Sequence, residues 1–156
     1  MSLQGRLIVN RNTLEMIKDY PILGTGLGTF AILYPKYRDS RLRMFMNAVH
    51  NDYLQFAEEM GIFGLGSFIA ILVLFFRKSL GLLRYARDRY IQGLAIGFLV
   101  SVAAIVIHGL GDFNLQIPAN ALLFWIILAL SSSLGLLARS EGRVAPAICE
   151  KGGASQ

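Results

Sequence analysis

The sequence has 156 residues, of which 54% are hydrophobic and 16% are charged. A soluble domain of this length usually has about a quarter of its residues charged, so the composition argues against a soluble protein and predicts a membrane protein. The formal net charge of +5 does not predict binding to nucleic acid, because the basic residues do not form one patch in the sequence. The one cysteine, Cys149, cannot form an internal disulfide.

The first third of the chain is mostly polar and is expected to be partly helical. Apolar residues at helical spacing predict a helix over residues 7–20, which Pro21 ends because proline disfavours helix in the residue before it. The predicted apolar face holds Leu7, Leu14 and Ile17, flanked by Val9 and Met16.

A glycine-dense turn follows, with the pattern Gly24-x-Gly26-x-Gly28. It lacks the G-x-G-x-x-G spacing, the preceding strand and the lysine of nucleotide-binding loops. We therefore expect a tight turn in which the backbone comes close to another segment, and no bound cofactor.

The stretch from His50 to Gly64 joins a polar segment to an apolar one without a break. Asp52, followed three residues later by Gln55, fits a capping box and predicts a helix start with His50 just outside it, where free N–H groups favour anions. His50 has three possible roles: a structural histidine, a metal ligand or a general base. Metal binding has little support because no H-E-x-x-H or similar ligand spacing surrounds it, whereas a neutral imidazole accepts a proton at pH 7.

Three apolar runs, residues 60–76, 91–110 and 121–138, predict three membrane spans. Residues 77–90 hold five basic residues and one acidic residue, which predicts a cytoplasmic loop. Residues 1–59 and 111–120 then lie on the opposite side. The expected fold is all-α and membrane-embedded, with a loop segment over 1–59, three spans over 60–138 and a disordered cytoplasmic tail over 139–156.

The polar 59-residue segment has no signal of its own to carry it across a membrane. We therefore expect the chain to be the C-terminal part of a larger protein, with further spans upstream. The small-residue spacings Gly93-x-x-x-Gly97 and Gly61/Gly64 predict close helix contacts.

Further candidate residues share the expected outer side with His50. A basic set there either binds lipid head groups or clamps a diphosphate, which arginine matches with two parallel hydrogen bonds. Its members are Arg6, Arg11, Lys36, Arg38, Arg41 and Arg43. His108 and Asp112 are spaced to meet at i,i+4, either as functional groups or as a structural hydrogen bond that closes the outer loop.

Several of these motifs together resemble the O-antigen ligase and O-antigen polymerase superfamily. His50-Asn51, nine residues and Gly61-Ile62-Phe63-Gly64 match its H-[NSQ]-x9-G-x-x-G signature. Residues 5–30 resemble its R-x-x-x-W…P-L-x-G-x-G-x-x-x-F stretch, except that Asn10 stands where the family often has tryptophan. Residues 34–38 and 108–114 also resemble family segments, so the resemblance covers residues 5–138.

The resemblance implies a multi-pass glycosyltransferase of the bacterial inner membrane whose active site lies in a large periplasmic loop. Such enzymes transfer a glycan from an undecaprenyl-diphosphate carrier to an acceptor hydroxyl on lipid A–core or on another glycan, with no metal or other cofactor. This chain resembles the end of that loop, with residues 1–59 periplasmic, and the last three spans, with a cytoplasmic C-terminus. Its expected partners are the lipid-linked donor, the acceptor, membrane lipids and the missing upstream helices.

The resemblance also implies roles for individual residues. His50 is expected to be the base or to orient the acceptor in an inverting transfer, and Asn51 to orient the imidazole or the acceptor. Arg6 is the first candidate to bind the diphosphate and Arg38 a weaker one, while His108 and Asp112 are secondary candidates. Ligase and polymerase both remain open, as does a non-catalytic fragment or subunit that binds glycan or lipid. A transporter segment ranks last, because it would have charged residues inside its spans and only His108 comes near to that description.

Overall fold

The computed structural model describes residues 3–38 and 48–143. Its regular elements are all helical, which confirms the predicted fold class. In chain order they are α1 (Leu3–Asp19), α2 (Phe30–Tyr37), α3 (Asp52–Tyr85), α4 (Arg89–His108), the short 3-10 helix η1 (Asn114–Gln116) and α5 (Pro118–Ser140).

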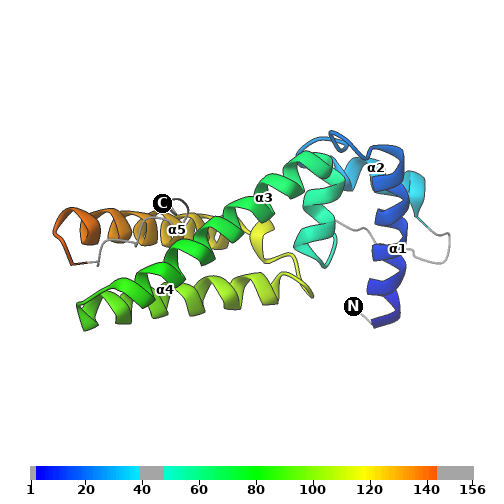
Figure 1. Ribbon diagram of the computed structural model, residues 1–156. Coiled ribbons are helices and arrows are strands. Elements are labelled where there is room, and N and C mark those ends of the chain that lie inside the picture. Colours follow the sequence, from blue (N-terminus) through cyan, green and yellow to red (C-terminus); the bar gives the residue numbers. More distant parts are fainter. Residues whose placement is uncertain (1–2, 39–47, 144–156) are drawn as a thin grey trace, which may run out of the picture.

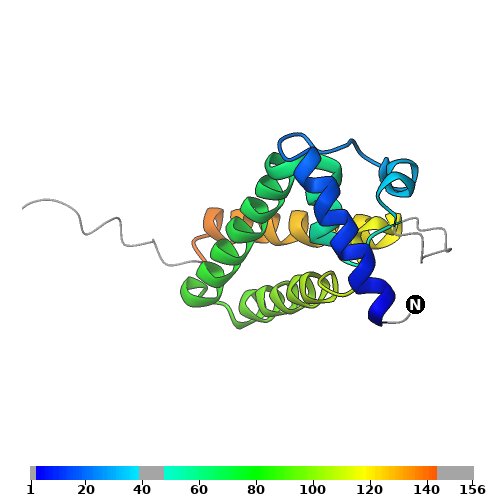
Figure 2. The ribbon, with the colours of Figure 1, turned by 90° about the vertical axis from the view of Figure 1, so that its right-hand side faces the viewer.

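The molecule has two regions, which α3 connects (Figures 1 and 2). At one end, α1 and α2 pack against the first turns of α3. We call this region the cap and include in it residues 3–38, residues 48–61 and the α4–α5 connection, residues 109–117. In the other region, α4 and α5 lie along the rest of α3. We call this region the bundle: residues 62–85 with α4 and α5.

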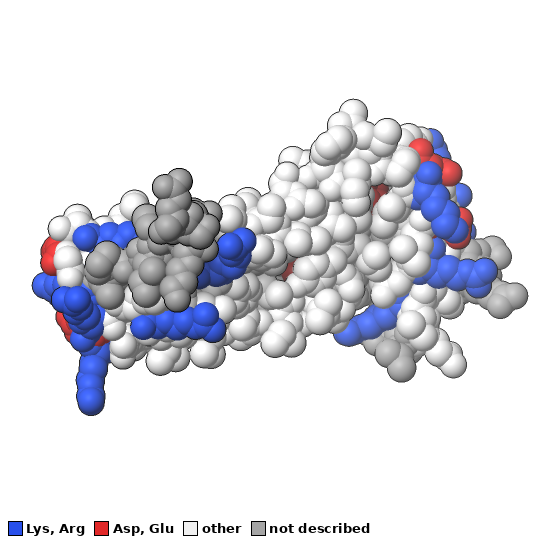
Figure 3. All heavy atoms as spheres, in the orientation of Figure 1, with Lys and Arg blue, Asp and Glu red and all other residues white. Residues whose placement is uncertain are grey.

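The three predicted membrane spans are confirmed. Among the described residues, α3, α4 and α5 are the helices long and apolar enough to cross a membrane. The first is longer than predicted, because α3 begins at Asp52 and continues to Tyr85, with a kink at Gly61. Residues 62–85 alone would extend about 36 Å, enough to cross a hydrocarbon core of about 30 Å. On the face drawn in Figure 3, the middle of the molecule is mostly uncharged and basic side chains lie towards both ends.

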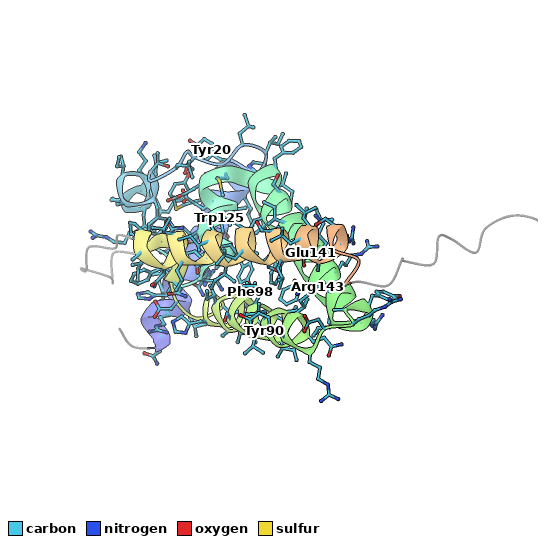
Figure 4. The ribbon with its side chains drawn as sticks, turned by 90° about the vertical axis from the view of Figure 1, so that its left-hand side faces the viewer. Tyr20, Tyr90, Phe98, Trp125, Glu141 and Arg143 are labelled. Atoms are coloured by element: carbon cyan, nitrogen blue, oxygen red, sulfur yellow. The ribbon has the colours of Figure 1, made fainter. Side chains whose placement is uncertain are left out.

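The basic residues between the first two spans lie mostly on a helix, not in the loop that we predicted over residues 77–90. Since α3 continues to Tyr85, the link to α4 is only residues 86–88. Asp88 caps α4 by accepting from Tyr90 N at 2.8 Å, and its other oxygen lies 3.2 Å from Arg143 Nη1. Figure 4 shows Arg143, with Glu141, just past α5 and near the start of α4.

The bundle is packed through aromatic and aliphatic side chains. Its largest cluster of buried residues is formed by Phe68, Leu72, Phe75, Val102, Phe124 and Leu128. A second cluster, at the basic end, is formed by Leu82, Ala86, Ile91, Ala95 and Ala138. The close contact predicted at Gly93 and Gly97 is not found among the described residues, because a Cβ added at either glycine would meet nothing within 4 Å.

The cap has its own core, formed by Val9, Met16, Phe30, Tyr34 and Val49. The predicted face of α1 is wrong, because Leu7 is 60% exposed and Leu14 is 47% exposed. The buried stripe is Val9, Thr13 and Met16 at i, i+4 and i+7. Thr13 fits in this apolar stripe because its hydroxyl donates to the Val9 carbonyl at 2.8 Å and so is not left unpaired.

Candidate functional site

The glycine-dense turn meets the kink of α3. Gly24 and Gly61 both have positive φ, 70° and 63°. A Cβ on Gly61 would strike the Ile22 carbonyl, and one on Gly24 would strike the backbone of Glu59. The prediction of a tight turn that brings its backbone close to another segment is therefore confirmed. The close contact at Gly61 is with this turn, and not with a helix as the spacing of Gly61 and Gly64 predicted.

The kink exchanges hydrogen bonds between α3 and this turn. In a regular helix, Ile62 N would donate to the Glu58 carbonyl, but here it donates to the Pro21 carbonyl at 2.9 Å. The Glu58 carbonyl accepts instead from Thr25 N at 2.9 Å. The Thr25 hydroxyl also donates to the buried Glu58 carboxyl group. This contact was not predicted, although two acidic residues directly before an apolar run were a signal for it.

Asn51, and not Asp52, caps the N-terminus of α3. Its side-chain oxygen accepts from Tyr53 N and Leu54 N, both at 3.0 Å, and its amide donates to the Leu110 carbonyl at 2.9 Å. The predicted capping box is therefore one residue out of position. Gln55 does not reach back to the cap residue, because its side-chain oxygen accepts from Val49 N at 2.7 Å. His50 lies just outside the helix, as predicted.

Asp52 fixes the α4–α5 connection to the start of α3. The carboxylate is 1% exposed, and Leu115 N lies 3.1 and 3.0 Å from its two oxygens. Asp52 N in turn donates to the Gly109 carbonyl at 2.8 Å. A Cβ on Gly109 would lie 2.7 Å from the carboxylate, so the close approach requires glycine. This role was predicted for neither Asp52 nor Gly109.

This connection places Asp112 beside His50. Asp112 Oδ1 lies 3.3 Å from His50 Nδ1 and accepts from Phe113 N at 2.9 Å. The Phe113 ring stands edge-on to the imidazole, with the ring centres 5.1 Å apart. The pKa of Asp112 is lowered, first by the Phe113 N–H and then by the hydrogen bond with His50.

With its lowered pKa, Asp112 is ionised at neutral pH, and this determines which ring nitrogen of His50 carries the proton. An ionised carboxylate only accepts hydrogen bonds, so Nδ1 must be the donor. In the neutral imidazole the lone pair is then on Nε2, which is free to accept a proton. The His50 side chain is 18% exposed, so the ring is partly shielded from solvent.

Arg6 reaches the same connection from α1. Its Nη1 donates to the Gly111 carbonyl at 3.0 Å, and its charge also helps to lower the pKa of Asp112. The structure thus gathers four predicted site residues, Arg6, His50, Asn51 and Asp112, around residues 109–116. The guanidinium of Arg6 makes no other hydrogen bond to a described residue, so most of its donors are available to a ligand.

Two other candidates lie apart from this group. Arg38 is exposed just beyond α2, and no hydrogen bond or ion pair joins it to a described residue. His108 is exposed at the end of α4, and within the described residues it makes no hydrogen bond to Asp112. The predicted i,i+4 meeting fails because the helix ends at His108 and Asp112 turns towards His50. Arg41 and Arg43 lie outside the described residues.

A cavity of about 410 Å³ lies between α1 and α2, lined by Ile8, Arg11, Asn12, Glu15 and Tyr37. The Tyr37 hydroxyl donates to Asp19 at 2.6 Å and so ties the end of α2 to the end of α1. This hydrogen bond is the main cause that raises the pKa of Tyr37 to about 12.

Comparison with known proteins bears on the part of the chain that contains His50. Residues 1–69 match the family model described as O-antigen ligase. The search of curated proteins and the search of solved structures each gave no match. The matched residues include α1, α2, His50 and Asn51, and also Gly24 of the turn and Gly61 of the kink. The resemblance predicted from the sequence is therefore confirmed for residues 1–69.

Proposed function

We propose that the chain carries out the transfer step of an O-antigen ligase-like glycosyltransferase, with His50 as the base. The observation that carries the proposal is the contact between His50 Nδ1 and Asp112, which leaves Nε2 free to accept a proton. His50 lies within the segment that matches the family and Asp112 lies beyond it, and Arg6 binds the same connection from α1.

In the proposed step, Nε2 takes the proton of an acceptor hydroxyl while the hydroxyl oxygen attacks the anomeric carbon of the donor glycan. The bond from that carbon to the diphosphate breaks, and a single displacement inverts the configuration at the carbon. Negative charge develops on the leaving diphosphate, where Arg6 stabilises it. Asp112 holds the imidazole in the required tautomer and stabilises the imidazolium that forms, as carboxylates do for catalytic histidines.

The proposal names the donor as a glycan on an undecaprenyl-diphosphate carrier and the acceptor as a hydroxyl on lipid A–core or on another glycan. It places the cap on the periplasmic side of the inner membrane, because the opposite end of the molecule is the more basic one: residues 77–90 hold five basic residues and one acidic residue. The apolar exterior of the bundle would hold the site at the membrane surface, where a lipid-linked donor presents its diphosphate.

The test is glycan transfer by the protein in a strain that lacks its own ligase. His50→Ala should abolish transfer while leaving membrane insertion intact, since a general base typically contributes about 10²–10⁴-fold. His108→Ala is the matched control and should transfer at close to the wild-type rate. Transfer at the wild-type rate by His50→Ala would overturn the catalytic role and favour a protein that only binds glycan or lipid.

Asp112 and Arg6 need different measurements because their proposed roles differ. Asp112→Asn should lower kcat and leave KM for the acceptor nearly unchanged, with part of the rate restored in Asp112→Glu. Arg6→Ala should weaken the use of the diphosphate donor. Unchanged kinetics in either variant would remove that residue from the site.

A further inference from the structure

A second cavity lies at the end of α3 farthest from His50, between α3 and α5. It has a volume of about 790 Å³ and is open to the surface. We call it the basic-end groove. The lining residues that matter here are Arg77, Lys78 and Tyr85 of α3 and Gly135 and Arg139 of α5.

The groove carries three positive charges that the described part of the protein does not neutralise. The side chains of Arg77, Lys78 and Arg139 are exposed, and no ion pair or hydrogen bond joins these side chains to a described residue. The two nearest acidic groups in the sequence, Asp88 and Glu141, both pair with Arg143 instead, at 3.2 and 2.7 Å.

Below these charges the groove is apolar and has room for an acyl chain. Phe75 and Leu82 are buried in its floor. The hydroxyls of Ser79 and Ser131 lie 3.1 Å apart, and one of them donates to the other. A Cβ added to Gly135 would meet nothing within 4 Å, which leaves space along α5.

We propose that the basic-end groove binds an anionic phospholipid. The phosphate would pair with Arg77, Lys78 and Arg139, and an acyl chain would lie along the apolar floor. The groove begins where the uncharged run of residues 60–76 ends, so we expect it at the depth of lipid head groups. Basic pockets between helices at this depth bind acidic head groups, and the half-exposed Tyr85 suits the same interface.

The three positive charges favour a phospholipid over another helix as the occupant of the groove. An apolar helix in the groove would cover the three charges without neutralising them, and a desolvated, unpaired charge is costly. A phosphate neutralises them, and guanidinium groups match its oxygens with two parallel hydrogen bonds. Its acyl chains meet the same apolar surface that a helix would cover.

The first test measures lipid binding to the 156-residue chain in detergent by native mass spectrometry. The probes are phosphatidylglycerol, zwitterionic phosphatidylcholine and inorganic phosphate. Phosphatidylglycerol should bind at least about tenfold more tightly than phosphatidylcholine, since each basic residue near a membrane surface contributes about 1 kcal/mol. Inorganic phosphate should bind more weakly than phosphatidylglycerol, because it has no acyl chain. Equal affinity of the two lipids, or of phosphatidylglycerol and phosphate, would overturn the proposal.

Two matched triple variants separate the groove from the general charge of this end. The groove variant should lose at least about tenfold in phosphatidylglycerol affinity, and the control, whose three basic residues do not line the groove, should change less than twofold. The groove variant carries Arg77→Gln, Lys78→Gln and Arg139→Gln, and the control Arg84→Gln, Arg87→Gln and Arg89→Gln. Equal losses in the two variants would show diffuse attraction and overturn the site.

A third comparison tests the acyl-chain part without changing charge. Gly135→Phe should fill the groove and lower the affinity for phosphatidylglycerol, whereas Gly97→Phe, at an equally open glycine of α4, should not. Unchanged binding by Gly135→Phe would overturn the proposal. If the chain formed a dimer, and Gly135→Phe dissociated the dimer without changing lipid binding, the occupant would be a second copy of the chain and the proposal would also be overturned.

Discussion

In the cap, groups far apart in the sequence meet through hydrogen bonds that require one geometry, whereas in the bundle three long helices pack apolar side chains together. Asp52 holds the backbone of Leu115, and Asn51 holds that of Leu110. The bundle core is a cluster of phenylalanine, leucine and valine, and Ser79 and Ser131 make a buried polar contact between its helices.

The difference shows how one chain combines a fixed site with an adaptable anchor. Apolar packing tolerates volume-conserving changes, because contact does not depend on the direction of a bond. A buried polar group that loses its partner pays the full cost of desolvation. We therefore expect the cap to be the more sensitive region to single substitutions, and the following predictions test this expectation from the largest effect to the smallest.

The largest effect is expected at the kink. Gly61→Ala should lower the free energy of unfolding by about 3–5 kcal/mol, because it combines a disfavoured backbone conformation with a collision against the Ile22 carbonyl. Gly28→Ala is the matched control: Gly28 also has positive φ, but a Cβ there would meet nothing within 4 Å. It should cost about 1–2 kcal/mol. Thermal unfolding in detergent measures both, and equal losses would show that the contact with the turn does not matter.

The next effect is expected at the start of α3. Asp52→Ala should cost about 2–3 kcal/mol, because the Leu115 N–H loses a charged acceptor in a buried place. Asp88→Ala removes an N-cap at the basic end, where the helix start is more exposed, and should cost about 1 kcal/mol. Unfolding in denaturant measures the difference. If Asp88→Ala cost as much as Asp52→Ala, the cap would not be the more sensitive region.

The contrast between the regions also explains what the sequence could predict. Spans depend on apolar runs, so all three were predicted and are confirmed, although kinked α3 begins before its run. The glycine turn was predicted because few residues other than glycine allow such a close backbone approach. The position of His50 outside a helix start was also predicted, from the local pattern alone.

The polar contacts of the cap were not predictable in the same way. Asp112 lies 62 residues after His50, and no local pattern indicates that the α4–α5 connection folds back to the start of α3. The N-cap moved to Asn51 because Asp52 is engaged by that connection. The buried face of α1 was misassigned because helical spacing fits two apolar faces, and α2 with Val49 selects the one that contains Thr13.

A smaller effect is expected in the bundle. Ser79→Ala and Ser131→Ala, alone and together, form a double-mutant cycle across the contact between α3 and α5. Its coupling energy should be about 0.6 kcal/mol, the average for hydrogen bonds between membrane helices. Ser101→Ala combined with Ser79→Ala serves as the control and should show no coupling, because Ser101 bonds to Gly97 of its own helix. A coupling above about 2 kcal/mol would exceed the measured range for such bonds and would make this contact as important as those of the cap.

The smallest effect is expected at the hydrogen bond between Tyr37 and Asp19. It belongs to the cap, but it is exposed, whereas the contacts of Asp52 are buried. The pKa of Tyr37 is raised from 10.0 to about 12, so the stabilisation from this bond is fully present below pH 10 and is lost as the pH rises to 12. Asp19→Asn should return the pKa of Tyr37 towards 10. The measurement is the ultraviolet absorbance of the phenolate as the pH rises, and subtracting the absorbance of the matching Tyr37→Phe variant isolates the signal of Tyr37. Glu15→Gln should leave it unchanged, because Glu15 pairs with Lys18. If Asp19→Asn changed the free energy of unfolding at pH 7 as much as Asp52→Ala, burial would not be what makes the polar contacts of the cap strong, and its sensitivity would need another cause.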